Sequence, residues 1–420
     1  MNASAKRRRR RQRRIALLAA AGALILAIVC GGLYLGIKTV LQKDKPATGT
    51  EVLADGSLET GSQSGLQNPS GSTVKITAGG DILLEDPILN YFNNGTWGSY
   101  MEALWPWLKN DDLSVVNMEV PIGGEELGIT GIDYSFNSPA ITASNVKEQG
   151  IEVVSLANNH AFDRGLQGII NTHQNLTNAG IGFTGTAAAP EEGRSIYSTE
   201  INGMKIGIVS YTYNTNQPQE ADWQVNTFES IYSDRSDALI EDIRKAKAEN
   251  DAVLACIHWG TEFTYDLNED QKVLAQAAAD AGADVILGNH PHCIQPAGWI
   301  DTADGRKTLC YYSLGNLASS AYQVDRADEA FQNMYELGAL ASFELQKDGD
   351  KIVVNPLEIV PYINQFENDY SSFALVPLRD YTEDMAARHD QRQFSDLFTR
   401  EWLAAQVDQV YAGSGLNVVK

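Results

Sequence analysis

Side chains that can bind metal ions stand at the ends of predicted strands in this sequence. Four of its six histidines, one aspartate and one glutamate directly follow or close apolar runs typical of strands: Asp81, Glu119, His160, His258, His290 and His292. Nitrogen and oxygen donors of this kind suit Mn, Fe or Zn, and the set contains no thiolate. Two ions about 3.5–4 Å apart can clamp a phosphoryl group and activate a water molecule. We therefore expect a divalent metal site, with hydrolysis as the chemistry it would support.

The elements that precede these residues predict how they come together. Apolar strands alternate with helical patterns along the chain, which favours an α/β fold of layered sheets and helices. Side chains just past the carboxyl ends of strands in such a sheet face one crevice, so the six residues are expected to converge. The predicted strands are 74–78, 113–116, 151–156, 252–257 and 284–287, and the predicted helices are 166–179, 237–249 and 270–281.

Hairpins and C-terminal elements are also predicted. The turn dipeptide Asn202-Gly203 separates strands 198–201 and 204–211. A second hairpin would join 294–300 to 308–313 across Asp304-Gly305. Further on, strands 337–345 and 351–359 are expected to pair, and 394–412 has a helical pattern.

Each candidate motif also has a structural explanation when it is taken alone. A single histidine after a strand is more often a hydrogen-bonded structural residue, and we assign that role to His173 and His389. Gly79-Gly80-Asp81 could be a turn whose aspartate caps a following helix. The joint occurrence of all six residues is harder to explain by structural need, and it favours the metal site.

The N-terminal region differs in charge from the rest of the chain. Residues 1–14 hold eight Lys and Arg and no acid, and the remainder holds 24 Lys and Arg against 54 acids, a net charge of −30. Such an acidic body argues against general nucleic-acid binding. Residues 15–37 are uncharged and mostly apolar, long enough to cross about 30 Å of hydrocarbon. The sequence therefore predicts a cytoplasmic tail (1–14), a transmembrane anchor (15–37), a flexible stalk (38–72) and a folded part outside the cell.

Cysteine usage and the apolar segment leave two alternatives to consider. A cleaved signal peptide would explain the N-terminus, although its apolar region is usually about 7–15 residues long. Cys30 lacks the small residues expected before a lipidated cysteine. Cys256, Cys293 and Cys310 are too few, and too apolar in context, for a disulfide framework, while one Cys293–Cys310 bridge remains possible.

Six motifs stand in order along the chain: Gly80-Asp81, Asn117-Met118-Glu119, 155–163 (SLANNHAFD), His258-Trp259-Gly260-x-Glu262, 282–292 (GADVILGNHPH) and 312–316 (YSLGN). Together they resemble the poly-γ-glutamate capsule synthesis protein family, CapA. The resemblance covers about 74–317 and implies a domain at 73–325, with strands and a helix at 326–420 that complete or flank it.

That family is similar to calcineurin-like metallophosphoesterases, which implies a four-layer α/β/β/α sandwich with two metal ions at the strand ends. By motif, Asp81, Glu119 and His292 would hold one ion. Glu119 would bridge to the second ion, whose further ligands would be Asn159, His258 and His290.

The same resemblance gives roles to other residues. His160 would be the general acid, and Asp163 would either orient its imidazole or cap a helix. Asn158, Glu262 and Asn316 would contact the ligands instead of the ions. Two positions differ from the metallophosphoesterase pattern: Leu83 stands where that pattern has a histidine, and Glu119 where it has an aspartate.

Three functions are compatible with these observations. The first is a membrane-anchored, metal-dependent hydrolase that serves poly-γ-glutamate or another cell-surface polymer. The second is a non-catalytic scaffold of the capsule machinery that binds polymer or synthase components. The third is a phosphatase that acts on a small ester. A body of charge −30 repels an anionic polymer unless metal ions or a basic groove offset the repulsion.

Overall fold

The computed structural model describes residues 72–92, 97–132, 135–228, 236–320 and 329–420. The predicted tail, anchor and stalk lie outside these residues, apart from Ser72. Within the described part of the chain, no helix has both the length and the apolar character needed to cross a membrane.

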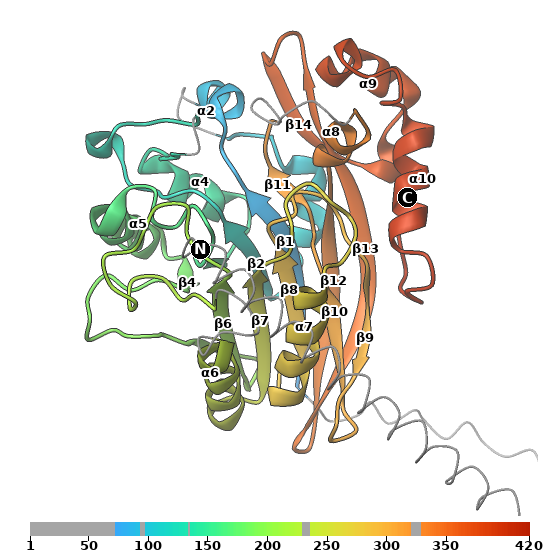
Figure 1. Cartoon of the computed structure of the whole chain (residues 1–420). Coiled ribbons are helices and arrows are strands. Elements are labelled where there is room, and N and C mark those ends of the chain that lie inside the picture. The colour runs from blue at the N-terminus through green and yellow to red at the C-terminus, as the bar shows by residue number, and fades with distance from the viewer. Residues whose placement is uncertain (1–71, 93–96, 133–134, 229–235, 321–328) are drawn as a thin grey trace, which may run out of the picture. The chain divides into compact units, whose positions relative to one another are not determined.

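Two mixed sheets form the body of the fold (Figure 1). One sheet has the order β14 (Ser372–Pro377), β13 (Lys351–Glu367), β12 (Leu337–Asp348), β1 (Thr73–Ile82), β2 (Leu113–Met118), β3 (Val153–Ser155) and β4 (Gly182–Thr184), with β11 (Asn316–Ala318) also paired to β1. The other has the order β5 (Tyr197–Ile201), β6 (Met204–Thr212), β7 (Ala252–His258), β8 (Val285–Asn289), β10 (Lys307–Tyr311) and β9 (Ala297–Asp301).

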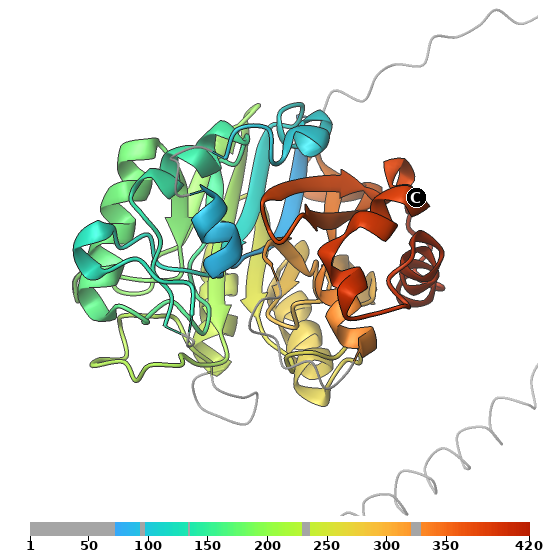
Figure 2. The ribbon, with the colours of Figure 1, turned by 90° about the horizontal axis from the view of Figure 1, so that it is seen from above.

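Strand direction decides where the functional edge lies. β1 to β4 run parallel in the first sheet, and β6, β7, β8 and β10 run parallel in the second. Three hairpins are antiparallel: β5 pairs with β6, β9 with β10, and β12 with β13. The carboxyl ends of the parallel strands therefore form one edge in each sheet. Figure 2 looks onto the fold from above, with the red C-terminal elements to one side.

Helices cover the outer face of each sheet, and three C-terminal helices pack against the cluster between the sheets. The described helices are α2 (Asp86–Phe92), α3 (Trp105–Leu108), α4 (Ile141–Glu148), α5 (Gly165–Ala179), α6 (Ser236–Glu249), α7 (Glu269–Ala281), α8 (Glu329–Tyr335), α9 (Glu383–Arg388) and α10 (Arg400–Val410). Short 3-10 turns cover Glu102–Leu104, Glu125–Leu127, Leu378–Asp380 and Asp390–Gln393.

Three apolar clusters hold these layers together. The largest joins the inner faces of the two sheets, with Ile76 of β1 and Leu254 of β7 among its buried members, and it also takes in Leu403 of α10. A second cluster packs the other face of the first sheet against α4 and α5, and a third packs β6 to β8 against α6 and α7. Burial of apolar area on this scale is the main force that fixes the relative position of the strand ends. The expected α/β class is confirmed, and the expected strands, hairpins and central helices are all present.

The structure corrects two expected boundaries, the end of the first strand and the start of the last helix, and it excludes three alternatives that the sequence left open. The first strand does not end at Gly79 but continues to Ile82, with an irregular register between Ala78 and Asp81, so Asp81 caps no helix. Glycine at position 80 lets the backbone of β1 pack closely against that of Gly315, since a Cβ on residue 80 would lie 1.9 Å from the Gly315 carbonyl oxygen.

The others concern caps and cysteines. Asp163 is not a helix cap, because α5 begins at Gly165 after Arg164 and has no side-chain cap. The last helix begins at Arg400 and not at residue 394, because Thr399 accepts a hydrogen bond from the backbone N–H of Trp402 and sets its start. Cys256, Cys293 and Cys310 are free and buried, so the Cys293–Cys310 bridge is absent.

Candidate metal centre

The predicted ligands lie at the carboxyl ends of the parallel strands. Asp81 is the penultimate residue of β1, Glu119 directly follows β2, and His258 is the last residue of β7. His290 directly follows β8, and Asn159 lies in the turn after β3. The two edges meet here, because the Asp81 carboxylate of the first sheet accepts a hydrogen bond from the backbone N–H of His290 in the second, at 3.2 Å.

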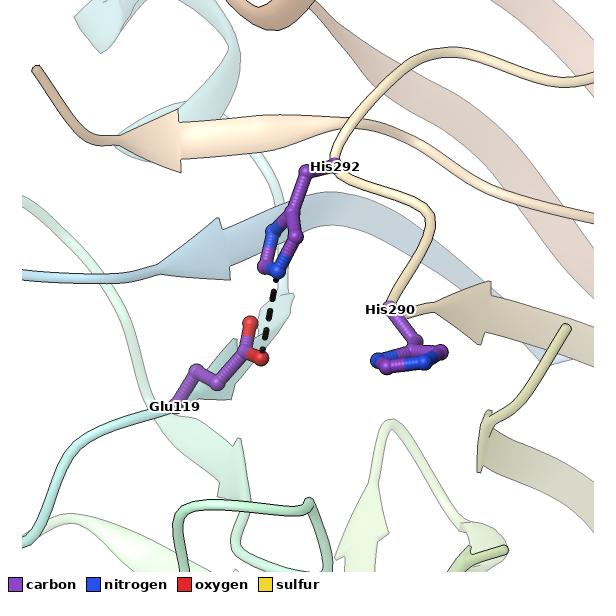
Figure 3. A group of neighbouring side chains, drawn as sticks. All are labelled: Glu119, His290 and His292. Carbon is purple, nitrogen blue, oxygen red and sulfur yellow. Dashed lines mark ion pairs between the residues drawn. The ribbon is translucent and has the colours of Figure 1, made fainter. Parts of the chain in front are cut away.

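Glu119 lies at the centre of this group of side chains. Its Oε1 is 3.3 Å from Nε2 of His258 and 3.7 Å from Nε2 of His292. Figure 3 shows His292 directed at the Glu119 carboxylate, with the His290 ring beside them. Two groups of donor atoms lie close enough to hold a cation: Glu119 with His290 and His292, and Asp81 with Glu119 and His258. Asn159 adds an amide oxygen 2.8 Å from Nε2 of His258.

The structure brings together all six predicted ligands but groups them differently from the resemblance. Both groups contain Glu119, as expected of a bridging carboxylate. His292 shares a group with His290, whereas the resemblance placed it with Asp81. The Asp81 carboxylate nevertheless lies 3.5 Å from Nδ1 of His292, so the two groups are contiguous. The assignment of each residue to a particular ion stays a prediction.

The backbone that carries the two histidines is strained. His290 has φ of 102° and His292 has φ of 56°, a region that residues with a Cβ seldom adopt. The N–H of His290 is held by Asp81, and the carbonyl of Pro291 accepts a hydrogen bond from the N–H of Phe263 at 3.1 Å. Strain of this kind persists where surrounding contacts enforce it, and it often marks functional sites. Here it turns both imidazoles toward Glu119.

Burial leaves the centre electrostatically unbalanced. Asp81 and Glu119 are completely buried, and the ion pairs recorded for them in the described residues are with histidines alone. Burial raises the pKa of Asp81 to about 7. Burial, followed by the charge of Asp81, raises the pKa of Glu119 well above its usual range. Burial likewise lowers the pKa of His258 and His290 strongly, and that of His292 to about 4.

Unpartnered polar atoms test whether these residues fit a cation. Both carboxylate oxygens of Glu119 and the Nδ1 atom of His290 are buried without a hydrogen-bond partner. Buried polar groups are normally hydrogen-bonded, and an uncompensated buried carboxylate costs several kcal/mol. A divalent cation would satisfy the carboxylates and would favour neutral imidazoles, the form that ligates metal. The donor set therefore fits a metal ion on both charge and geometry.

His160 and Asp163 form a hydrogen-bonded pair beside the predicted ligands. Nδ1 of His160 lies 2.7 Å from Oδ2 of Asp163, which also accepts from the backbone N–H of Phe136 at 2.8 Å. The Phe136 ring packs edge-on against the imidazole. Since the carboxylate only accepts, Nδ1 carries the proton, and Nε2 faces the Nδ2 atom of Asn216 at 3.4 Å. His160 belongs to neither group of possible ligands found among the described residues.

The remaining predicted residues contact this core in different ways. The Asn158 amide donates to the carbonyl of Met118 at 2.8 Å and accepts from the His160 N–H at 3.1 Å, so it orients the turn that carries Asn159 and His160. Asn316 lies 3.0 Å from Nδ1 of His292. Glu262 is half-buried, and none of the hydrogen bonds recorded between described residues joins it to a predicted ligand. Leu83 is buried in an apolar cluster and offers no donor.

Three contacts were not found from the sequence. Nδ2 of Asn117 donates to Asp81 at 2.7 Å and lies 3.3 Å from Nδ1 of His258, so it links the two sheets beneath the site. Tyr213 packs its ring 4.7 Å from His290, and Tyr335 packs 5.6 Å from His292. Asn117 could have been found, because it lies near the end of β2, two residues before Glu119. The two tyrosines carry no local signal.

Comparisons with known proteins cover the part of the chain that carries these residues. A family model described as bacterial capsule synthesis protein PGA_cap matches residues 75–321, a range that contains every predicted site residue. The PGA biosynthesis protein CapA of Bacillus subtilis is 32% identical over 220 residues, which is 51% of this chain and 52% of that protein. The match therefore spans about half the length of that relative.

Two further relatives are more distant in sequence. The capsule biosynthesis protein CapA of Bacillus anthracis is 26% identical over 335 residues, 75% of this chain and 78% of that protein. A probable polyglutamine synthesis accessory protein of Mycobacterium tuberculosis is 25% identical over 254 residues, 56% of this chain and 64% of that protein.

Proposed function

The chain belongs to the bacterial capsule synthesis protein family PGA_cap, and from this premise we propose a metal-dependent role in making a cell-surface polymer. The polymer is poly-γ-glutamate or a related anionic chain, and the partners are components of its synthase or export machinery. The support for polymer and partners comes from the roles in PGA, capsule and polyglutamine synthesis that the names of the relatives state.

The proposed site is a dinuclear centre of hydrolase type. The single observation that carries it is that Glu119 is completely buried between three histidines with both oxygens unpartnered. Bound there, divalent Mn, Fe or Zn would supply charge neutralisation and Lewis-acid activation for hydrolysis. The residues that would hold it are Asp81, Glu119, Asn159, His258, His290 and His292.

The chain's own residues account for the proton transfer that hydrolysis needs. Asp163 fixes the His160 ring through Nδ1, so Nε2 is the atom that would donate a proton to a leaving group. Asn216 lies over this nitrogen and is held by a hydrogen bond from its backbone N–H to the carbonyl of Asn159, at 2.7 Å. A leaving group would therefore meet His160 between the turn that carries Asn159 and the segment that carries Asn216.

We also propose the finer architecture and the location. Two face-to-face sheets between helices support a relation to the four-layer metallophosphoesterase sandwich. The eight cations of residues 1–14 followed by an uncharged stretch at 15–37 support a single-pass anchor with the domain outside the cell.

A non-catalytic scaffold is the second candidate, and a specific observation favours it. Leu83 lies in an apolar cluster where the metallophosphoesterase pattern has a ligand, so the chain offers one donor fewer than that pattern. Such a centre could bind a metal that stabilises the fold without activating a substrate.

Metal analysis of the full chain, together with a hydrolysis screen over phosphoesters and γ-glutamyl polymers, separates the two candidates. His258→Ala removes a donor and is expected to lose metal. His160→Ala should keep its metal and fold while its turnover falls by about 10²–10⁴-fold. If His160→Ala supports polymer production as well as the wild type while His258→Ala does not, the scaffold is correct. If both variants are harmless, the pocket is not the functional site.

A further inference from the structure

Asn316 contacts His292 on the side of the ring that faces away from Glu119. Its Oδ1 lies 3.0 Å from Nδ1 of His292, while Nε2 of the same ring points at Glu119 (Figure 3). Asn316 begins β11 and is paired with Asp81 in the ladder between β11 and β1. It is completely buried. The residue therefore sits behind the candidate metal centre and does not line it.

The orientation of the Asn316 amide follows from its neighbours. Nδ2 lies 3.1 Å from the carbonyl oxygen of Tyr335 and 3.4 Å from that of His292. Carbonyl oxygens only accept, so the amide NH₂ must occupy this position and Oδ1 must face the imidazole. Since Oδ1 also only accepts, Nδ1 of His292 must be the nitrogen that carries the proton. The nearby Asp81 carboxylate, 3.5 Å from Nδ1, favours the same form.

We infer that Asn316 is a positioning residue that fixes His292 as the Nδ1–H tautomer and thereby presents the lone pair of Nε2 to a cation beside Glu119. The other tautomer would place a proton on Nε2, where a ligand needs its lone pair. Partners on the far ring nitrogen orient ligating histidines in this way and set their tautomer. The inference deepens the proposed function and rests on its metal centre.

The C-terminal segment beyond the family match holds Asn316 in place. The carbonyl of Asn316 accepts hydrogen bonds from the Tyr362 hydroxyl at 3.0 Å and from Nδ2 of Asn364 at 3.3 Å. Tyr335 supplies the carbonyl that orients the amide. A Cβ on Gly338 would lie 2.4 Å from the Asn316 carbonyl oxygen, so β12 passes at close range. The described residues 329–420 thus help build the centre, although the family match ends at 321.

Three variants of the full chain in detergent test this role. Asn316→Leu keeps the approximate size but removes the acceptor. Asn316→Asp, neutral when buried, can accept from Nδ1 of His292 with one oxygen and donate to Tyr335 from the other. Asn333→Leu is the matched control, since the Asn333 amide is also completely buried and hydrogen-bonded, to Ser395 and Gln391, far from the ligands in sequence. Mn²⁺ affinity is measured by titration calorimetry.

The second measurement is the ring ¹⁵N spectrum of metal-free protein labelled at histidine, with His292→Gln used to assign the His292 signals. We expect wild type to show Nδ1–H for His292 and Asn316→Leu to show a mixture of tautomers with an about 10–100-fold loss of Mn²⁺ affinity. Asn316→Asp should approach wild type on both measurements, and Asn333→Leu should match it.

Two results would overturn the inference: an unchanged tautomer and affinity in Asn316→Leu, or an equal loss in Asn316→Asp. Wild-type protein that binds no Mn²⁺ would refute the metal centre of the proposed function instead. The tautomer in the metal-free spectrum would still decide the role of Asn316.

Discussion

Replacement of Asp81 by asparagine should stabilise the metal-free protein while weakening its metal binding. Asp81 is completely buried, accepts hydrogen bonds from Asn117 and from the backbone N–H of His290, and pairs with no Lys or Arg in the described residues. Without a cation, the neighbours of its negative charge are neutral donors, a weakly basic imidazole and the Glu119 carboxyl group, and none of them neutralises it. Asparagine has nearly the same shape and no charge, so the substitution tests the electrostatic cost directly.

The magnitude follows from the pKa of this carboxyl group. Burial raises the pKa of Asp81 from 3.8 to about 7, so between these pH values the folded protein holds a proton that the unfolded chain has released. The free energy of unfolding therefore falls as pH rises through this window, by about 1.4 kcal/mol per unit and about 4 kcal/mol in all. Asparagine does not ionise, so the variant does not lose this stability as pH rises. It has one acceptor oxygen fewer, and the lost hydrogen bond lowers the free energy of unfolding by about 1–2 kcal/mol. Asp81→Asn should thus be more stable by about 2–3 kcal/mol at pH 8 in EDTA.

Urea denaturation of the full chain, followed by tryptophan fluorescence at pH 4.5 and pH 8 in EDTA, measures this difference. The advantage should be present at pH 8 and small or reversed at pH 4.5, while Mn²⁺ should stabilise wild type more than the variant. Asp251→Asn is the control of opposite sign, because Lys347 lies 2.7 Å from Asp251 and helps hold its pKa below the usual range. A variant less stable than wild type at pH 8, or a wild-type stability that does not change with pH, would show that the buried charge is compensated.

Three other predictions concern the close packing at Gly80, the buried His389 and the proposed membrane anchor. Gly80→Ala should destabilise the fold by at least about 1–3 kcal/mol in thermal melts, because its Cβ would meet the Gly315 carbonyl. The control Gly298→Ala, where a Cβ meets nothing within 4 Å, should have a stability close to that of the wild type. Burial lowers the pKa of His389 to about 3, so below about pH 6.5 the unfolded chain binds a proton that the folded protein does not, and the free energy of unfolding should fall as pH drops. His389→Phe should reduce this loss of stability at acid pH in urea titrations. An unchanged dependence of stability on pH would contradict the prediction. Protease added to intact cells should remove the folded domain and leave a small membrane stub, whereas full-length chain in the cytosolic fraction would refute the anchor.

The convergence of the ligands could be predicted because it depends on two local signals. Apolar runs ending in His258 or just before His290 identify strand ends, and parallel strands in layered sheets bring such ends to one edge. The rule does not require knowledge of strand order. It works for Glu119 and Asp81 as well, although the first strand proved longer than expected. Sequence reasoning was therefore strongest where chemistry follows directly from strand direction.

The corrections have different physical origins. Gly79 and Gly80 look like a turn, but Gly80 serves a close approach between β1 and the Gly315 backbone, a contact 235 residues away in the chain. Asp163 looks like a helix cap, but the His160 imidazole and the Phe136 N–H compete for its carboxylate. For Gly80 a tertiary contact decides the role of the residue, and no pattern within a short window carries that information. For Asp163 the deciding imidazole lies three residues away, so the motif already included this role as one of two alternatives.

The length of the Glu119 side chain explains how a centre with one missing donor is built. Glutamate has one methylene more than the aspartate of the metallophosphoesterase pattern, so a carboxylate that starts from the end of β2 reaches between His258 and His292, at 3.3 and 3.7 Å. Leu83 cannot contribute from β1, since it packs in the apolar cluster on the helix-covered face of that sheet. Both groups of donors then depend on the same carboxylate. No other side chain is shared between the two groups. A cation bound to one group would therefore offset part of the buried Glu119 charge and so change the electrostatic free energy of the other group.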